Sequence, residues 1–369
     1  MKAAVLREFG KDMPIEDVKL DDPKDREVLI RITAAGVCHS DLSVARGKGS
    51  VPLPCILGHE AAGVIEKAGP GVSRVKKGDT VVLSWTPYCG NCFYCRAGLP
   101  AQCEAYVRAG GTGTLFDGTG RLTSASGERI YHFTCQSSFA EYAVMPETGV
   151  LPIHKDIPAT VAALVGCAVT TGYGAVVNDA KARPGEYLAI WGLGGVGISA
   201  LMAARLCNAE VIVVVDPNPR KEEVARRFGA THYINPKTTE DVPGKIRELT
   251  QGRGVDAAFD CIGRQAAFEQ GYNAVRPGGA LVVVGQAPRG DVFTIPAARA
   301  FPAVQKRILG SYYGGGIPEQ DFLRILDLYR IGKLDLDAMV GKTVPLSGVN
   351  DAFRQLESGV DTRTVLVFN

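Results

Sequence analysis

The chain lacks the charge clusters and apolar segments that mark nucleic-acid-binding and membrane proteins. Its 369 residues carry 41 Lys and Arg against 39 Asp and Glu, and the formal net charge of +2 includes no basic block. The first residues, MKAAVLREFGKD, contain no apolar core and no cleavage signal of a signal peptide. We also find no apolar run that approaches the length of a membrane span. We therefore expect a cytoplasmic protein that binds neither nucleic acid nor a membrane.

Cysteine is too scarce for a secreted disulfide scaffold, yet half of it is clustered. The chain has 10 cysteines, and five of them lie between Cys89 and Cys135. In a reducing compartment such residues are more often metal ligands or small buried apolar side chains. Cys55, Cys207 and Cys261 have apolar neighbours, so we expect inert core thiols at these positions.

The first part of the chain predicts short strands separated by turns. Residues 3–6 and 27–32 have β-branched, partly alternating patterns, and further strands are expected at 62–67 and 80–83. A length of 369 residues suggests two domains, and this part predicts a compact β-rich one. Cys38 follows soon after the second strand, where side chains of functional sites commonly lie.

Residues 84–138 differ from their surroundings. CGNCFYC at 89–95 and Cys103 form a C-x₂-C-x₂-C-x₇-C pattern, and a Gly- and Thr-rich stretch with little hydrophobic periodicity follows at 110–127. A closed Cys₄ zinc site would order this segment, since structural zinc contributes folding free energy. Free buried cysteines and an iron–sulfur cluster are the alternatives. The bacterial iron–sulfur run has a shorter last gap followed by Pro, so zinc is favoured.

From about residue 185 the pattern alternates between strands and helices. Apolar strands are expected at 187–191, 211–215, 233–234, 257–260 and 281–284, and helices at 198–206, 221–228, 245–250 and 265–275. Continuous apolar strands separated by helices predict a parallel sheet that is covered on both faces. Helices near 319–329 and 349–357 and a strand at 364–368 are expected after it.

A glycine fingerprint between the first strand and helix of this part predicts a dinucleotide site. The segment Gly192-Leu193-Gly194-Gly195-Val196-Gly197 follows an apolar strand and opens a helix. Gly192 would permit the tight turn, Gly194 would let the backbone approach a pyrophosphate, and Gly197 would allow close packing of the helix. A plain Gly-rich turn is the alternative.

An acidic residue completes this fingerprint. Asp216 ends the strand at 211–215, where a carboxylate would accept hydrogen bonds from the adenosine ribose hydroxyls. Its charge would repel a 2′-phosphate, which favours NAD over NADP. Arg220 and Lys221 lie nearby and weaken this preference.

Six motifs together resemble those of zinc-dependent medium-chain alcohol dehydrogenases. They are GVCHSD at 36–41, GHEAAG at 58–63, CGNCFYC with Cys103, GCAVTTGYG at 166–174, GLGGVG at 192–197 and TRTVLVF at 362–368. The long stretch between Cys103 and Phe139 is similar to the class I and class III branch. The resemblance implies an α/β fold with a Rossmann doubly wound parallel sheet plus a β-rich GroES-like catalytic domain. The catalytic domain would cover 1–168 and 313–369, with the zinc lobe at about 84–138, and the NAD-binding domain would cover 169–312.

The resemblance also implies two zinc ions per chain. Cys38, His59 and Cys167 would bind the catalytic ion, and this Cys₂His set, the one known from alcohol dehydrogenases, leaves a fourth position open. Cys89, Cys92, Cys95 and Cys103 would bind the structural ion. Two thiolates cancel the charge of Zn²⁺ while leaving it Lewis acidic enough to lower the pKa of an alcohol. A purely structural role for the first set is the alternative.

Roles for the neighbouring residues follow from the same resemblance. Asp41 would hold His59, Glu60 would lie behind the metal, and Ser40 would take the alcohol proton. The NAD contacts would be His39 and Arg363 at the pyrophosphate, Thr171 and Val196 at the nicotinamide, Gly192, Gly194, Gly195 and Gly197 at the turn, and Asp216 and Lys221 at the ribose. Many family members have a His where this chain has Ser43. We therefore expect Ser40 to pass its proton through the ribose to water or to His39.

The implied substrate pocket is narrow near the metal. Its lining would be Trp85, Phe133, Thr134, Gln286 and Tyr312, with Gly49 at the mouth. The bulky Trp85 favours a flat or linear primary alcohol that is aromatic, allylic or medium-chain, together with its aldehyde. A thiol adduct of formaldehyde, as in class III enzymes, is the alternative, with Arg108 as its anion contact.

Two other function classes and an assembly are also considered. The chain could be related to zinc-requiring quinone or enoyl reductases, which generally lack this complete ligand set. It could also be a non-catalytic NAD- and zinc-binding structural or sensor protein, in which the Cys₂His set would have no explanation. By resemblance, pairing of sheet edges near 301–313 would give a homodimer or homotetramer.

Overall fold

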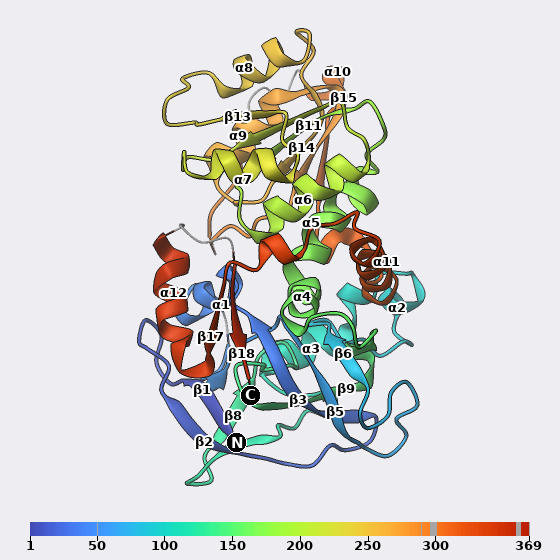
Figure 1. Ribbon diagram of the computed structural model, residues 1–369, viewed down its shortest axis with the longest axis vertical. Coiled ribbons are helices and arrows are strands. Elements are labelled where there is room, and N and C mark those ends of the chain that lie inside the picture. Colours follow the sequence, from blue (N-terminus) through green and yellow to red (C-terminus); the bar gives the residue numbers. More distant parts are fainter. Residues whose placement is uncertain (50, 289, 296–300, 359–362, 369) are drawn as a thin grey trace. The chain divides into compact units, whose positions relative to one another are not determined.

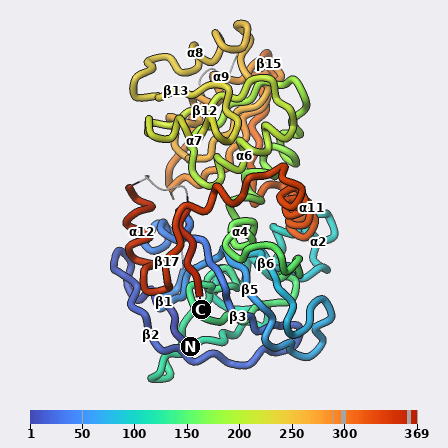
Figure 2. Tube along the Cα trace, viewed as in Figure 1, coloured from blue at the N-terminus to red at the C-terminus, as the bar shows by residue number. Residues whose placement is uncertain are grey.

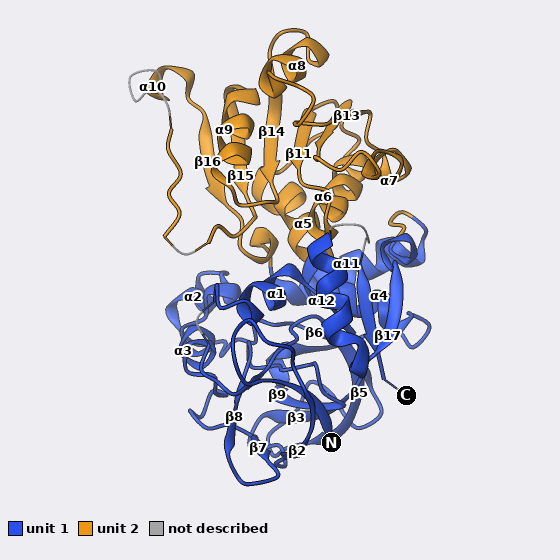
Figure 3. Ribbon diagram, turned by 90° about the vertical axis from the view of Figure 1, so that its left-hand side faces the viewer, with its two compact units in different colours: residues 1–168, 317–332, 336–369 blue, residues 169–316, 333–335 orange. Residues whose placement is uncertain are grey.

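The chain forms two compact units in a computed structural model that describes residues 1–369 except 50, 289, 296–300, 359–362 and 369. Unit 1 contains residues 1–168, 317–332 and 336–369, and unit 2 contains residues 169–316 and 333–335 (Figure 3). The chain trace returns to unit 1 after residue 316 (Figure 2). Residues 313–316 and 333–335 thus lie in unit 2, whereas the sequence assigned them to the catalytic domain. Thr362, the first residue of the last motif, lies outside the described residues.

Unit 1 is built from a small barrel and a larger sheet (Figure 1). The barrel joins, in spatial order, β1 (Lys2–Leu6), β2 (Ile15–Leu20), β7 (Leu122–Ser124), β8 (Arg129–His132) and β4 (Cys55–Ile56). The 7-stranded sheet has the order β10 (Val150–Pro152), β6 (Thr80–Leu83), β5 (Ala61–Ala68), β3 (Glu27–Gly36), β18 (Thr364–Val367) and β17 (Lys342–Pro345), with β9 (Tyr142–Pro146) also paired to β3.

The late strand β18 lies inside this sheet. It pairs antiparallel with β3, with Val365 opposite Gly36, and parallel with β17. Val365 and Leu366 have no exposed surface, because the apolar run at 364–367 is covered on both faces. The C-terminal part of the chain is therefore tied to the strand that leads into Cys38.

Short helices surround the strands of unit 1. They are α1 (His39–Ala45), α2 (Phe93–Arg96), α3 (Glu104–Thr112), α4 (Ala159–Leu164), α11 (Pro318–Arg330) and α12 (Val349–Ser358), with 3₁₀ turns at Pro100–Gln102, Glu147–Gly149, Asp337–Met339 and Leu346–Gly348. Helices α11 and α12 were expected at nearly these bounds. Helix α1 was not, since only seven residues separate Cys38 from Arg46 and so short a segment shows no clear period.

One apolar helical stretch corrects the sequence prediction. Residues Ala159–Ala180 form 22 helical residues, and the most apolar 18-residue window among them has a mean hydropathy of 1.7, which is long and apolar enough to cross a membrane. The statement that no apolar run approaches this length was therefore wrong. Because 83% of its most apolar window is buried inside the protein, the stretch is a core helix whose apolar surface is covered by neighbouring elements.

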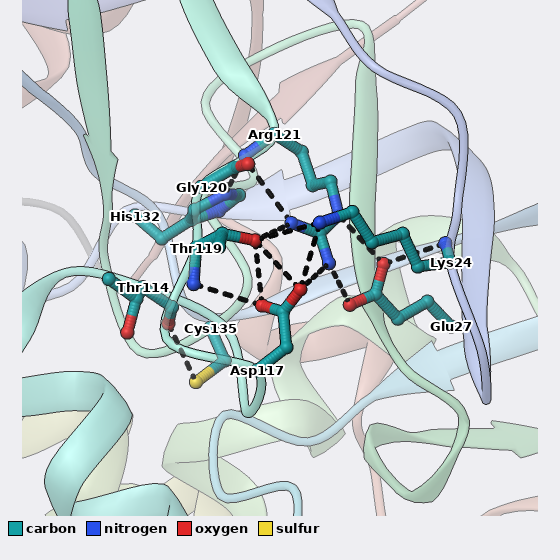
Figure 4. Close-up of polar contacts among 9 residues, drawn as sticks. All are labelled: Lys24, Glu27, Thr114, Asp117, Thr119, Gly120, Arg121, His132 and Cys135. Carbon is teal, nitrogen blue, oxygen red and sulfur yellow. Dashed lines mark hydrogen bonds and ion pairs between the residues drawn. The ribbon is translucent and has the colours of Figure 1, made fainter.

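An ionic network centred on the buried Arg121 lies in the Gly- and Thr-rich stretch that follows the cysteine cluster (Figure 4). The Arg121 side chain is fully buried, and its Nε donates to Glu27 Oε2 at 2.9 Å. Its Nη2 also lies 2.9 Å from Asp117 Oδ2, which Lys24 Nζ reaches at 3.0 Å, while the backbone N–H of Thr119 donates to Asp117 Oδ1. Metal binding is thus not the sole source of order in this segment, contrary to the emphasis of the sequence prediction.

Unit 2 contains a 6-stranded parallel sheet. Its spatial order is β13 (His232–Ile234), β12 (Val211–Val215), β11 (Tyr187–Trp191), β14 (Val255–Asp260), β15 (Val275–Val283) and β16 (Arg307–Gly310). The helices of unit 2 are α5 (Thr170–Gly174), α6 (Gly195–Leu206), α7 (Lys221–Phe228), α8 (Val242–Leu249), α9 (Gln265–Ala274) and α10 (Phe301–Val304). Numbered along the chain, the strands follow the Rossmann order 3-2-1-4-5-6. The predicted α/β class, a Rossmann sheet with a β-rich partner domain, is confirmed.

Candidate active site

Three potential metal ligands from separate parts of unit 1 converge. Cys38 joins β3 to α1, His59 precedes β5, and Cys167 lies in a π-helical turn, Val165–Val169. Their ligand atoms, together with a carboxylate oxygen of Glu60, all lie within 4.8 Å of one another. His59 Nε2 is 3.3 Å from Cys167 Sγ, and all four residues are buried. Two sulfurs and one imidazole nitrogen form a donor set that suits zinc.

Asp41 fixes the orientation of His59. Its Oδ1 lies 2.9 Å from His59 Nδ1 and accepts a hydrogen bond from the backbone N–H of Gly58 at 3.0 Å. The carboxylate is completely buried, so it is held in one position. Because this contact places the proton on Nδ1, the lone pair of Nε2 points toward the sulfur atoms and can bind a metal.

The three ligands strongly affect one another's protonation. The contact with Cys167 lowers the pKa of Cys38 well below its usual value, and the same contact together with burial raises the pKa of Cys167. Burial disfavours a charged His59, yet the adjacent Asp41 raises its pKa. The cluster therefore stabilises one thiolate already, and thiolate is the form in which cysteine binds zinc.

A buried ion pair lies beside the ligands. Arg363 Nη2 contacts Glu60 Oε2, and the two side chains are 3% and 0% exposed. Burial raises the pKa of Glu60 to about 7, while the charge of Arg363 acts in the opposite direction. Among the described residues, Glu60 Oε1 has no hydrogen-bond partner. Arg363, which the resemblance places at the pyrophosphate, thus pairs with Glu60 in this structure.

The four clustered cysteines form a second group of ligands. Their sulfur atoms lie within 4.8 Å of one another, with Cys103 buried and Cys89, Cys92 and Cys95 half-buried. The backbone N–H groups of Cys95 and Glu104 lower the pKa of Cys92 to about 6, which favours a thiolate. Four converging sulfurs with no further position suit a closed structural zinc site.

Helix α1 carries Ser40 and His39, the predicted proton-relay residues, and also Ser43, which stands where many family members have a His. Ser40 is half-buried, whereas His39 and Ser43 are exposed. All three lie in unit 1, within the first turns of one helix. Ser40 is the hydroxyl residue that is nearest in sequence to the potential metal ligand Cys38.

Two aromatic rings lie next to His59. The Trp85 ring is edge-on to the imidazole, with centroids 6.1 Å apart, and the Phe133 ring is edge-on at 5.7 Å. Trp85 in turn contacts Tyr106 at 6.2 Å. Tyr106 was missed by the sequence analysis. Its position three residues after Cys103, in the first turn of a helix, was the available signal.

The other predicted pocket residues are divided between the two units. Thr134 is half-buried with a φ of 52°, and Gly49 is exposed beside Val44. Gln286 is exposed and Tyr312 is 37% exposed, and both belong to unit 2. Within unit 1, the structure therefore brings Trp85 and Phe133 to His59.

The glycine fingerprint has the geometry that a pyrophosphate requires. Gly192 has a φ of 86°, which residues with a side chain rarely adopt. A Cβ at Gly197 would lie 1.8 Å from the Gly192 carbonyl oxygen, so the turn and helix α6 approach too closely for any side chain. A Cβ at Gly194 would meet no heavy atom within 4 Å, which leaves this side of the turn open for an anion at the helix N-terminus.

Asp216 lies beside this turn at the end of β12. Its Oδ2 accepts a hydrogen bond from the Leu193 N–H at 2.8 Å and pairs with Lys221 Nζ at 3.3 Å. The two residues expected at the adenosine ribose are therefore neighbours. Thr171 and Val196 also lie on segments that pack together, because a Cβ at Gly172 would be 2.2 Å from the Val196 carbonyl oxygen.

Comparisons with known proteins agree with this geometry. An alcohol dehydrogenase GroES-like domain matches residues 24–155 and a zinc-binding dehydrogenase domain matches residues 195–330. S-(hydroxymethyl)glutathione dehydrogenase from Paracoccus denitrificans is 37% identical, over 100% of this chain and 99% of that protein. Alcohol dehydrogenase class-3 from Cereibacter sphaeroides is 38% identical over the same shares. The crystal structure of benzyl alcohol dehydrogenase from Acinetobacter calcoaceticus has a TM-score of 0.94, with 35% identity over 100% of this chain and 99% of that one.

The fold and the two ligand groups define a dehydrogenase that uses a nicotinamide cofactor and zinc. The chain belongs to the zinc-dependent medium-chain alcohol dehydrogenase family. It is an NAD-dependent oxidoreductase with zinc as its metal, which confirms the predicted activity and cofactors.

Proposed function

We propose that this dehydrogenase interconverts primary alcohols and aldehydes that are flat or linear, with aromatic, allylic or medium-chain alcohols preferred. The observation that carries the proposal is the pair of rings, Trp85 and Phe133, that stand edge-on to the ligand His59. Bulky rings beside the imidazole would narrow the space near the metal, which would suit a planar or unbranched substituent and disfavour branching near the carbinol carbon. The likeness to benzyl alcohol dehydrogenase supports the same preference.

The chain's own residues would hold and orient the reacting groups. Cys38, His59 and Cys167 would hold the catalytic zinc, with Asp41 fixing the tautomer of His59. Bound zinc supplies a Lewis acid that lowers the pKa of the alcohol, and NAD supplies the hydride acceptor. Ser40 would accept the alcohol proton, since its hydroxyl follows Cys38 on α1.

The second ligand group and unit 2 would have supporting roles. Cys89, Cys92, Cys95 and Cys103 would hold the structural zinc. Unit 1 would act as the catalytic domain and unit 2 as the NAD-binding domain, with Asp216 and Lys221 at the adenosine ribose and the turn at 192–197 at the pyrophosphate.

The test is a comparison of initial rates of NADH formation with purified, zinc-loaded protein and NAD⁺. The substrates are ethanol, hexanol, benzyl alcohol, a terpene alcohol, a secondary alcohol and formaldehyde with glutathione. We expect the highest kcat/KM for benzyl alcohol, the terpene alcohol or hexanol, and loss of turnover with a zinc chelator. A clear preference for the secondary alcohol would contradict the proposed pocket.

A thiol adduct of formaldehyde is the second candidate substrate. The relative named S-(hydroxymethyl)glutathione dehydrogenase supports it, and the exposed Arg108 on α3 offers a cation for the adduct's carboxylates. If this candidate is correct, formaldehyde with glutathione will exceed benzyl alcohol in kcat/KM, and Arg108→Ala will raise the KM for the adduct alone. An unchanged KM would remove Arg108 from the site.

The location and assembly are also proposals. We propose a cytoplasmic homodimer or homotetramer that pairs sheet edges at β16. This strand is the last in the sheet of unit 2 and so has one unpaired side within the described chain. Sedimentation velocity of the purified protein tests this, and a monomer at micromolar concentration would contradict it.

A further inference from the structure

A chain of aromatic contacts leads from the candidate active site to the cysteine cluster. His59 and Trp85 are edge-on, with an interplanar angle of 87°, and Trp85 and Tyr106 meet at 64° with centroids 6.2 Å apart. Tyr106 is only 6% exposed. The Trp85 ring therefore contacts both the proposed zinc ligand His59 and Tyr106.

Tyr106 also contacts the second ligand group through its backbone. It lies in the first turn of α3, which begins directly after Cys103. The backbone N–H of Tyr106 hydrogen-bonds to Cys103. Tyr106 thus has its backbone beside Cys103 and its ring against Trp85.

Packing in this region connects the same groups. Cys103, Tyr106, Leu115 and Cys135 belong to one apolar core, against which Trp85 and the remaining clustered cysteines are packed. Trp85 lies in the irregular segment between β6 and α2. Because this segment is neither strand nor helix, the position of its ring depends on side-chain packing and not on a regular backbone ladder.

We propose that Tyr106 is a positioning residue that couples the structural-zinc site to substrate discrimination. The ring of Tyr106 holds Trp85 edge-on to His59, and the Cys₄ site holds α3 so that Tyr106 stays in place. Loss of either support lets Trp85 move and widens the inner pocket. The inference rests on the proposed function of the Cys38–His59–Cys167 site.

The experiment compares Tyr106→Leu with the conservative Tyr106→Phe. Leu keeps apolar volume but removes the ring, whereas Phe keeps the ring. Val107→Ala is the matched control, since Val107 is the next residue of α3 and is 59% exposed. Each zinc-loaded variant is measured for the ratio of kcat/KM between benzyl alcohol and a branched alcohol, and for kcat with ethanol.

We expect Tyr106→Leu to lower the benzyl-to-branched ratio about fivefold, the size of one aromatic contact. Ethanol turnover should stay within about twofold, because a small alcohol does not test the pocket width. Tyr106→Phe and Val107→Ala should keep the wild-type ratio. In a Trp85→Leu background, which has no ring for Tyr106 to hold, Tyr106→Leu should have no further effect on the ratio, which a general loss of stability would not reproduce.

Fluorescence provides a readout that is independent of turnover. The chain has two tryptophans, Trp85 and Trp191, so a Trp191→Phe protein reports on Trp85 alone. If that variant does not fold, the wild-type minus Trp85→Phe difference spectrum replaces it. We expect Tyr106→Leu to red-shift the emission and increase acrylamide quenching. Cys92→Ser, with one zinc per chain by elemental analysis, should produce the same change.

Unchanged emission and an unchanged ratio in Tyr106→Leu, with two zincs bound, would overturn the proposal. A shift in Tyr106→Leu without one in zinc-depleted Cys92→Ser would overturn its coupling to the Cys₄ site. If the wild-type protein oxidises no alcohol of the panel, the proposed substrate class fails, but the fluorescence comparison still decides whether Tyr106 positions Trp85.

Discussion

The carboxylate of Asp41 determines which nitrogen of His59 can bind a metal. We predict that Asp41→Ala weakens zinc binding at the Cys38–His59–Cys167 site about ten- to a hundredfold, because the imidazole loses its fixed tautomer and orientation. Asp41→Asn, whose amide oxygen still accepts from Nδ1, should lose less. Zinc affinity is measured by competition with a chromophoric chelator. Asp12→Ala, at an exposed acid, is the control, and equal affinity in Asp41→Ala and wild type would contradict the role.

Ser40 is the residue that we propose as acceptor of the alcohol proton. We predict that Ser40→Ala lowers kcat at least about a hundredfold, as expected for loss of a proton acceptor, while the Kd for NADH stays unchanged. Ser40→Thr keeps a hydroxyl and should recover much of the rate. Stopped-flow turnover and NADH titration check this. Nearly normal turnover in Ser40→Ala would show that the alcohol proton leaves by another route.

Sequence motifs are enough to predict site residues whose partners lie close to them in the sequence. Cys38, Asp41 and His59 could be named because they lie within two short motifs. The pair between Glu60 and Arg363 could not, since 303 residues separate its members. Only the fold brings the guanidinium beside the ligands, so the sequence assigned it to the pyrophosphate alone.

At the scale of single elements, the turn between β11 and α6 contains one glycine that we expect to matter for cofactor binding and another that we expect to matter for stability. We predict that Gly194→Ala leaves the melting temperature nearly unchanged but weakens NADH binding about tenfold or more, because its Cβ enters only the open side of the turn. Gly197→Ala should instead destabilise unit 2 by about 1–3 kcal/mol, since its Cβ would overlap the Gly192 carbonyl. Thermal unfolding and NADH titration of both variants test this, and wild-type NADH affinity in Gly194→Ala would be the contrary result.

Strand β8 ends in a histidine that makes the barrel sensitive to acid. Burial lowers the pKa of His132 to about 3, below its ordinary value near 6.5. The unfolded chain therefore binds a proton first, so stability that is present above about pH 6.5 is lost as the pH falls toward 3.

We predict that His132→Gln removes this pH-dependent loss of stability. The substitution keeps an acceptor for the backbone N–H of Arg121. Between about pH 7.5 and about pH 5.5 the wild type should lose about 1 kcal/mol more than the variant. Urea unfolding at both pH values provides the measurement. The same pH dependence in both proteins would exclude His132 as the cause.

The predictability of elements follows their periodicity. Strand β11 and helix α7 were expected with their observed bounds, because a five-residue apolar run and an amphipathic eight-residue run are clear local signals. Strand β4 has two residues and pairs with β8. A two-residue strand is defined only by its pairing with a strand that is distant in the sequence. No local pattern of residues therefore predicts it.

For the whole molecule, unit 1 depends on the part of the chain that follows unit 2. We predict that ending the chain at residue 358, before β18, abolishes alcohol oxidation and zinc retention at the Cys38 site, because the sheet of unit 1 loses an inner strand. Unit 2 lacks no strand and should still bind NADH. Limited proteolysis and NADH titration test this, with Phe368→Ser as a mild control. A protease-resistant unit 1 without β18 would contradict the prediction.

The division into a β-rich and a parallel-sheet part could be anticipated from the change of pattern near residue 185. The interleaving of the two could be anticipated only by resemblance, since hydrophobic periodicity does not reveal which unit a distant strand joins. Residues 333–335 illustrate the limit, because three residues between two longer segments of unit 1 carry no pattern of their own.

The inner position of β18 also sets an order of events during synthesis. On the ribosome, every strand of the parallel sheet has been made once Gly310 emerges, so the nucleotide-binding unit can fold while translation continues. The sheet of unit 1 can be completed only after Val367 has emerged, so its zinc ligands can meet metal before that sheet closes.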